Sequence, residues 1–215
     1  MIKEGVMNLG LRFGVVLLAY ALGSIPTALI YSKLRRRADI RTLGDGNMGA
    51  RNTKRQFGFY AGVLVGSADI LKGTLAVFLA VLLHLPLEWQ LLAGAAAILG
   101  HDFPIFAGFK GGQGFATTSG VFLALFPIPA LIGFVIYAFL YLLFRNSDLS
   151  AVFAMSQLAL HAVLDREPVI SLVFIVLVLL FIPFKKWLDQ PRREAIEEKK
   201  DKGDQRNLRN MEGKD

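Results

Sequence analysis

Residues 111–144 read GGQGFATTSGVFLALFPIPALIGFVIYAFLYLLF and contain no Asp, Glu, Lys, Arg or His. Two further uncharged runs cover residues 13–32 and 168–184. A helix needs about 20 apolar residues to cross the hydrocarbon core of a bilayer. These runs lack the strict alternation of barrel strands, and a helix satisfies its own backbone hydrogen bonds in lipid. The sequence therefore predicts an all-α polytopic membrane protein.

The run 111–144 is too long for one straight crossing. As a single helix it would extend about 51 Å, whereas the hydrocarbon core is about 30 Å thick. It must therefore kink or turn back at Pro127 and Pro129, and we favour a helical hairpin. The other expected helices cover about residues 10–32, 57–83, 89–100, 149–164 and 168–184. With the hairpin, about seven transmembrane helices are predicted.

Positive charge is concentrated directly after the first expected helix, and the whole chain has a formal net charge of +7. Only Asp39 and Asp45 oppose the basic residues of this loop, which are Lys33, Arg35, Arg36, Arg37, Arg41, Arg51, Lys54 and Arg55. The positive-inside rule places such a loop in the cytoplasm and the N-terminus outside the cell membrane. A basic loop beside a membrane helix fits membrane lipids or a phosphorylated metabolite better than nucleic acid.

The domain organisation follows from the same charge pattern. Residues 1–187 are expected to form a membrane helical bundle, and residues 188–215 a charged cytoplasmic tail with both signs intermixed. An outside N-terminus and an inside tail require an odd number of crossings, in agreement with seven. The chain has no Cys, which excludes disulfides and thiolate metal sites.

The first candidate site is the glycine-rich part of the basic loop. Gly44, Gly46 and Gly49 formally match a dinucleotide fingerprint, but that motif works only between a strand and a helix of a βαβ unit. Closely spaced glycines nevertheless let backbone N–H groups form a nest for an anion, and Arg55 adds charge. The alternative, held equally, is a flexible basic loop that lies against anionic lipid.

The second candidate site is the loop from His101 to Gly114, which places an imidazole, a lysine and several glycines between two apolar segments. The loop lacks the Gly-Lys-Ser/Thr ending of a P-loop. Lys110, flanked by glycines, can still meet phosphate oxygens as a point charge. His101 taken alone would be better explained as a structural histidine.

A third feature is a pair of opposite charges, Asp69 and Lys72, inside the second expected helix. Three residues apart, they lie on one helix face. Charges at membrane depth are expensive and normally face a bundle interior or a cavity. The pair either locks helices together or supports the floor of a site, and the sequence favours neither.

Taken in order, these motifs resemble the acyl-phosphate:glycerol-3-phosphate acyltransferase (PlsY) family over about residues 15–165. The residues that carry the resemblance are Gly23-Ser24-Ile25-Pro26, Gly44-x-Gly46-Asn47-x-Gly49-Ala50-x-Asn52-x-x-Arg55, Asp69-x-x-Lys72-Gly73 and Gly100-His101-x-Phe103-Pro104-x-Phe106-x-x-Phe109-Lys110-Gly111-Gly112-x-Gly114-x-Ala116-Thr117. The resemblance implies a seven-helix bundle whose site opens to the cytoplasm. It also implies transfer of a fatty acyl group from acyl phosphate to the 1-hydroxyl of glycerol 3-phosphate, giving lysophosphatidic acid without metal or coenzyme A.

The resemblance and the chemistry of these loops together nominate the site residues. The catalytic candidates are Arg55, His101 and Lys110. The substrate-binding candidates are Gly44, Asp45, Gly46, Asn47, Gly49, Asn52, Lys72, Gly111, Gly112, Gln113 and Gly114. No paired nucleophile and base is evident, so a substrate phosphate is the expected proton acceptor.

Three departures from the family pattern favour an alternative. The family has Ser where this chain has Asp45, and Lys where it has Gln113. The family's C-terminal His and Asn are missing from the stretch assigned to them, residues 181–187. Asp45 would repel a phosphate, and Gln113 removes a compensating charge. The alternative is a non-catalytic PlsY-like membrane protein that binds a phosphorylated metabolite or anionic lipid.

Overall fold

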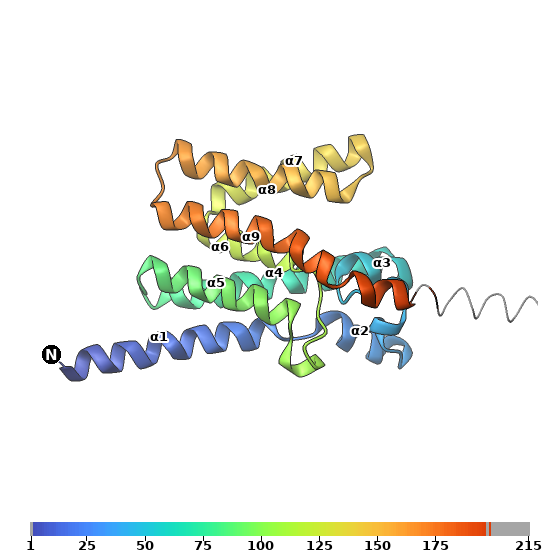
Figure 1. The fold of residues 1–215 in the computed structure, drawn as a ribbon, viewed down its shortest axis with the longest axis horizontal. Coiled ribbons are helices and arrows are strands. Elements are labelled where there is room, and N and C mark those ends of the chain that lie inside the picture. Colours follow the sequence, from blue (N-terminus) through green and yellow to red (C-terminus); the bar gives the residue numbers. More distant parts are fainter. Residues whose placement is uncertain (1, 197, 199–215) are drawn as a thin grey trace, which may run out of the picture.

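The computed structural model describes residues 2–196 and 198, and this part of the chain contains helices and no strand. Most of the helices lie lengthwise beside one another in a bundle (Figure 1). They are α1 (Ile2–Gly23), α2 (Thr27–Arg36), α3 (Ala50–Phe57), α4 (Phe59–Leu82), α5 (Leu87–Asp102), α6 (Phe115–Leu125), α7 (Pro127–Phe144), α8 (Ser147–Leu164) and α9 (Val169–Leu188), with short 3-10 turns at Ile40–Thr42 and Ile105–Ala107.

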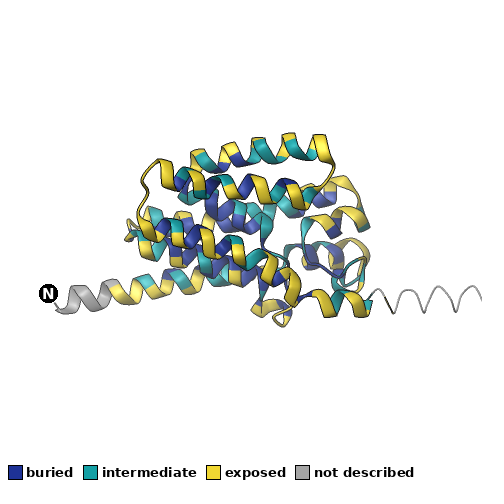
Figure 2. Ribbon diagram, turned by 45° about the horizontal axis from the view of Figure 1, so that its top comes forward, coloured by how far each residue is buried: buried dark blue, intermediate teal, exposed yellow. Residues whose placement is uncertain are grey.

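Six spans are long and apolar enough to cross a membrane, and α6 is a shorter apolar helix. Buried residues gather on the inward faces of the helices, while exposed residues predominate on the outside (Figure 2). The exposed outer residues include many large apolar side chains, for example Leu17, Phe139 and Leu177. Lipid tails cover such a surface at no hydrophobic penalty. The predicted class, an all-α multi-pass membrane protein, is confirmed.

The first expected helix, residues 10–32, is interrupted. Helix α1 ends at Gly23 and α2 begins at Thr27, with Pro26 between them. Proline has no N–H group, so a continuous helix would lose a backbone hydrogen bond there. At the break, the carbonyl oxygen of Ile25 accepts a hydrogen bond of 2.9 Å from Lys72 Nζ on α4. The sequence did not predict this break, because the apolar run continues through it.

The predicted turn at the two prolines is confirmed. Helix α6 ends at Leu125 and α7 begins at Pro127, where the missing N–H is not needed for the helix. Helix α7 then packs against α8, and Gln157 Nε2 donates to the carbonyl oxygen of Pro129 at 2.7 Å. With 11 residues, α6 is much shorter than α7. The two helices form an unequal hairpin.

Both glycine-rich loops lie at the same end of the bundle, opposite the end where the chain begins (Figure 1). The first of these loops is followed by α3, a helix that was not predicted. Gly58 separates α3 from α4 and has φ +94°, a conformation that favours glycine. This single residue therefore lets the chain turn from a surface helix into a membrane helix.

Close helix packing fixes the position of the loops. A Cβ atom added to Gly120 on α6 would lie 1.9 Å from the carbonyl oxygen of Ile70 on α4. One added to Gly73 on α4 would lie 2.3 Å from the carbonyl oxygen of Thr117 on α6. Small residues of this kind allow two membrane helices to approach backbone to backbone. Helix α6 is thereby held against α4, with its first turn beside the loops.

Residues 190–196, assigned by the sequence to the charged tail, are helical and follow α9 after a turn at Asp189. Their side chains contact both glycine-rich loops. The rest of the predicted tail, residue 197 and residues 199–215, lies outside the described residues.

Candidate functional site

The two glycine-rich loops, residues 37–49 and 103–114, touch directly. Arg41 of the first loop donates from Nη1 to the carbonyl oxygen of Ala107 in the second, at 2.8 Å. The same guanidinium pairs with Asp39 at 2.6 Å, and this hydrogen bond lowers the pKa of the Asp39 carboxyl group. Ile40 and Met48 pack with Ala107 in a small buried cluster. The loops are therefore joined by both polar and apolar contacts.

The first loop is held in shape by Asn52, whose side chain is fully buried. Its Nδ2 donates to the carbonyl oxygens of Leu43 at 2.9 Å and Asn47 at 3.0 Å. Gly44 has φ +58°, and an added Cβ would lie 2.2 Å from Asn52 Oδ1. The shape of the loop thus depends on a glycine and an asparagine together, and Asn52 acts from inside the loop.

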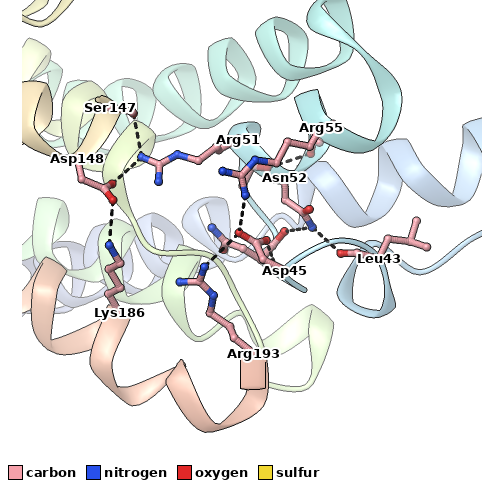
Figure 3. Close-up of polar contacts among 12 residues, drawn as sticks. Leu43, Asp45, Arg51, Asn52, Arg55, Ser147, Asp148, Lys186 and Arg193 are labelled. Atoms are coloured by element: carbon pink, nitrogen blue, oxygen red, sulfur yellow. Dashed lines mark hydrogen bonds and ion pairs between the residues drawn. The ribbon is translucent and has the colours of Figure 1, made fainter. Parts of the chain in front are cut away.

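Asp45 lies between two arginines (Figure 3). Its Oδ2 is 3.5 Å from Arg55 Nη1 and 3.4 Å from Arg193 Nη2, while its Oδ1 accepts from the backbone N–H of Asn47 at 3.1 Å. The Asp45 side chain is 11% exposed. Its negative charge is therefore compensated within the structure.

The glycines of the second loop allow it to lie against the end of α5. An added Cβ at Gly111 would lie 2.1 Å from the carbonyl oxygen of His101, and one at Gly112 would lie 2.2 Å from His101 Nε2. The backbone N–H of Gly112 donates to the carbonyl oxygen of His101 at 3.2 Å. Gly114, with φ +70°, then starts α6. Larger residues would push this loop away from the imidazole.

Lys110 is exposed at the tip of the same loop. Within residues 2–196 its ammonium group forms no hydrogen bond or ion pair, and the half-buried side chain of Gln113 forms no hydrogen bond. A cation without an acidic partner is suited to receive an anionic ligand. Lys110 is thus the candidate whose position most directly fits phosphate binding.

Three ionisable side chains form a buried floor beneath the loops. Lys72 Nζ is 2.8 Å from Asp69 Oδ1, which confirms the predicted pair, and His101 Nδ1 is 3.5 Å from the same oxygen. Thr27 on α2 donates to that oxygen at 2.7 Å. The floor therefore joins α2, α4 and α5 below the helix break, and His101 connects it to Gly112.

Two helices begin directly at the glycine-rich loops. Helix α3 starts after Gly49 and α6 after Gly114, and neither start has a side-chain cap. The first N–H groups of a helix have no partner inside the helix and carry a partial positive charge, which favours bound anions. These N–H groups, together with Arg55 and Lys110, make this end of the bundle suitable for phosphate groups.

The contribution of the C-terminal part of the chain to the site was not predicted from the sequence. Lys185, at the end of α9, is 1% exposed and pairs with Asp189, and its ammonium group lies 5.0 Å from the centre of the Phe103 ring. Arg192 and Arg193 reach the second and first loops respectively. Lys185 and Asp189 are four residues apart in a helix, and from this spacing their ion pair could have been predicted.

Within residues 2–196 and 198, no group of three or more His, Asp or Glu side chains is placed to hold a metal ion.

Comparison with known proteins finds relatives that match most of the chain. The chain is 42% identical over 168 residues to glycerol-3-phosphate acyltransferase 2 of Bacillus anthracis, covering 77% of this chain and 88% of that protein. It is 50% identical over 129 residues to glycerol-3-phosphate acyltransferase of Bacillus subtilis (strain 168), covering 60% of this chain and 66% of that protein.

The fold also matches a solved structure. The crystal structure of PlsY, an integral membrane glycerol 3-phosphate acyltransferase, in its glycerol 3-phosphate form, superposes with a TM-score of 0.77 at 33% identity. The match covers 86% of this chain and 92% of that one. The family profile described as glycerol-3-phosphate acyltransferase matches residues 13–192. The chain belongs to the glycerol-3-phosphate acyltransferase family.

Proposed function

We propose that this protein transfers a fatty acyl group from acyl phosphate to the 1-hydroxyl of glycerol 3-phosphate. The hydroxyl oxygen attacks the acyl carbonyl carbon, and the bond between that carbon and the phosphate oxygen breaks. The products are lysophosphatidic acid and inorganic phosphate, and the hydroxyl proton passes to a phosphate oxygen. No metal ion or coenzyme A takes part.

The observation that carries this proposal is the meeting of two glycine-rich loops, each followed by an uncapped helix start, at one end of a membrane bundle. The reaction brings two phosphorylated molecules together, and their mutual repulsion must be offset by cations and N–H groups. Arg55 and Lys110 supply cations, and the loop glycines supply backbone N–H groups that orient phosphate and stabilise charge on the acyl carbonyl oxygen.

The remaining candidates divide by burial. Asn52, Lys72 and His101 are buried and bonded to protein groups, which fits positioning of the loops from beneath. Asp45, Gly49 and Gln113 are half-buried in the loops, and Gly44 is exposed. The other loop candidates are buried within the turns of the loops, and they are Gly46, Asn47, Gly111, Gly112 and Gly114. With His101 in that position, a substrate phosphate remains the better proton acceptor.

The alternative, a non-catalytic relative that binds a phosphorylated metabolite or anionic lipid, is not favoured. One of its three supports was the negative charge of Asp45, but that carboxylate has Arg55 and Arg193 beside it. The relatives that carry the enzyme's name also match most of the membrane bundle.

The proposed reaction is tested with protein purified in detergent. With acyl phosphate and glycerol 3-phosphate present, mass spectrometry should detect lysophosphatidic acid, and equal amounts of inorganic phosphate should be released. Acyl coenzyme A in place of acyl phosphate should give no product. Binding of glycerol 3-phosphate without any acyl transfer would support the non-catalytic alternative instead.

The proposed site faces the cytoplasm, with the protein in the cell membrane. The basic loops and the loop between α7 and α8 lie at one end of the bundle, and the connection between α4 and α5 carries no Lys or Arg. This asymmetry of Lys and Arg supports an outside N-terminus.

Cysteine labelling in intact cells tests the orientation. The exposed positions Arg51 and Glu88 are suitable, because the native chain has no cysteine. We expect Arg51→Cys to resist a membrane-impermeant maleimide until the cells are opened, and Glu88→Cys to react at once. Gln113→Cys should behave like Arg51→Cys. Labelling of positions 51 and 113 from opposite sides would be incompatible with one shared site.

A further inference from the structure

Residues 189–196, called here the C-terminal segment, lie across both glycine-rich loops. Arg193 Nη2 is 3.4 Å from Asp45 Oδ2 in the first loop, and Arg192 Nη2 is 3.5 Å from the carbonyl oxygen of Gly111 in the second. A Cβ added to Gly46 would lie 2.3 Å from Cδ1 of Ile196. The segment therefore forms part of the site surface, although it follows the last membrane helix.

The ion pairs of Asp45 are looser than those nearby. Its carboxylate oxygen lies 3.4 Å from Arg193 and 3.5 Å from Arg55. Arg51, one turn from Arg55, pairs with Asp148 at 2.7 Å (Figure 3). Charge-assisted hydrogen bonds between guanidinium and carboxylate normally have lengths of about 2.7–2.9 Å. The two guanidinium groups are thus held near Asp45 without forming strong bonds to it.

The C-terminal segment and the end of α9 bring further cations to the loops. These are Lys185, Arg192 and Arg193, and Arg55 already lies there. Asp45 and Asp189 are the carboxylates paired with these cations. Glu194 also belongs to this segment, so the contribution of Arg193 depends on its position beside Asp45 and not on an excess of positive charge in the segment. The segment therefore adds a guanidinium group beside Asp45 of the first loop, whereas the second loop has the neutral Gln113.

We propose that Arg193 is a phosphate-binding residue of this site and that Asp45 holds it, with Arg55, until a substrate phosphate takes over both guanidinium groups. A phosphate presents several acceptor oxygens with more negative charge than a carboxylate, and it can receive paired N–H groups from each arginine. The ligand replaces the weak pairs of Asp45 by shorter hydrogen bonds. This inference rests on the proposed acyl transfer, because glycerol 3-phosphate and acyl phosphate are the two phosphates concerned.

The segment has other attachments that do not need Arg193. Asp189 pairs with Lys185 and lies 3.7 Å from Arg192, and Ile196 contacts Gly46. The Arg193 side chain is 27% exposed and reaches the loops only through Asp45 among its described contacts. Removing its charge should therefore leave the segment in place, so that an effect on substrate binding can be separated from loss of structure.

The experiment compares Arg193→Ala and Arg193→Lys with the native enzyme in acyl-transfer assays. Each substrate is titrated at a saturating level of the other, and this shows which phosphate Arg193 contacts. Loss of a charge-assisted hydrogen bond should raise the KM of one substrate about tenfold or more in Arg193→Ala, with kcat changed less. Arg193→Lys should recover part of the loss. Asp45→Asn should lower the same KM, because it removes the competing anion.

Lys186→Ala is the matched control, because Lys186 is a nearby cation that pairs with Asp148 at 3.0 Å, away from Asp45. It should leave both KM values unchanged, and all variants should keep the native melting temperature. Unchanged KM values for both substrates in an active Arg193→Ala enzyme would overturn the inference alone. A native protein without any acyl transfer would overturn the proposed function and the inference with it.

Discussion

Replacing Lys110 by alanine is expected to weaken glycerol 3-phosphate binding by about tenfold to a hundredfold, and Arg55→Ala should have a similar effect. The loss corresponds to about 1.5–3 kcal/mol for a hydrogen bond to a charged group. Lys110 forms no ion pair within residues 2–196, so no protein carboxylate competes with the substrate phosphate for its ammonium group. Binding is measured by titration calorimetry and by the KM for acyl transfer.

The control for this prediction is Arg35→Ala. Arg35 is an exposed cation on α2 at the same end of the bundle, and its removal changes the net charge equally. If the effect comes only from the overall positive field, all three variants should weaken binding alike. Equal losses, or native affinity in both Lys110→Ala and Arg55→Ala, would contradict direct phosphate contact.

The family residues offer a test in the opposite direction. Asp45→Ser combined with Gln113→Lys should strengthen glycerol 3-phosphate binding, because it removes a carboxylate and adds a cation beside the same loops. Affinity is the appropriate measurement, since the turnover rate also depends on the C-terminal part of the site. Absence of binding by the native chain and by this double variant at millimolar phosphate would assign the loops to packing or lipid contact.

The largest effect on stability is expected for Asp69→Asn. Asp69 is fully buried, and one of its oxygens lies near Lys72, Thr27 and His101. The substitution leaves the Lys72 cation inside the bundle without its counter-charge. Breaking a buried pair in this way costs about 3–5 kcal/mol. A clear fall in the melting temperature in detergent is therefore expected, measured by differential scanning fluorimetry.

A double variant separates the pair from other roles of its members. Adding Lys72→Met to Asp69→Asn removes the unpaired cation and should recover part of the lost stability. The control is Asp165→Asn, because Asp165 is an exposed carboxylate at the end of α8. This variant should have the melting temperature of the native protein. Strictly additive losses from the Asp69 and Lys72 substitutions would indicate separate functions.

The sequence determined the fold class because hydrophobic length is a local property. An uncharged run either can or cannot cross a bilayer, whatever its neighbours are. The hairpin at Pro127 was predictable for the same reason, since a helix of the full run would be too long for the membrane. The glycines and cations of both loops were also readable, because phosphate binding needs these residue types close together in the chain.

Other features depend on which residues of distant helices pack against a segment, and not only on the sequence of the segment itself. The break at residues 24–26 was not predicted, although Pro26 was visible, because neighbouring helices can support a proline within an apolar run. Here the supporting group is Lys72 on α4, which bonds to the carbonyl oxygen of Ile25. The same lysine was predicted as a partner of Asp69 and as a substrate-binding residue, but not as a donor to the broken helix.

The tertiary structure alone decided how the site is completed. Asp45 and Arg193 are 148 positions apart in the sequence, and no local pattern connects a first-loop carboxylate with an arginine after the last helix. Asn52, expected to bind substrate, has its amide group enclosed by carbonyl oxygens of its own loop. Side-chain charges are given by the sequence, but the distances that decide whether they pair, compete or stay available are set by the packing of helices far apart in the chain.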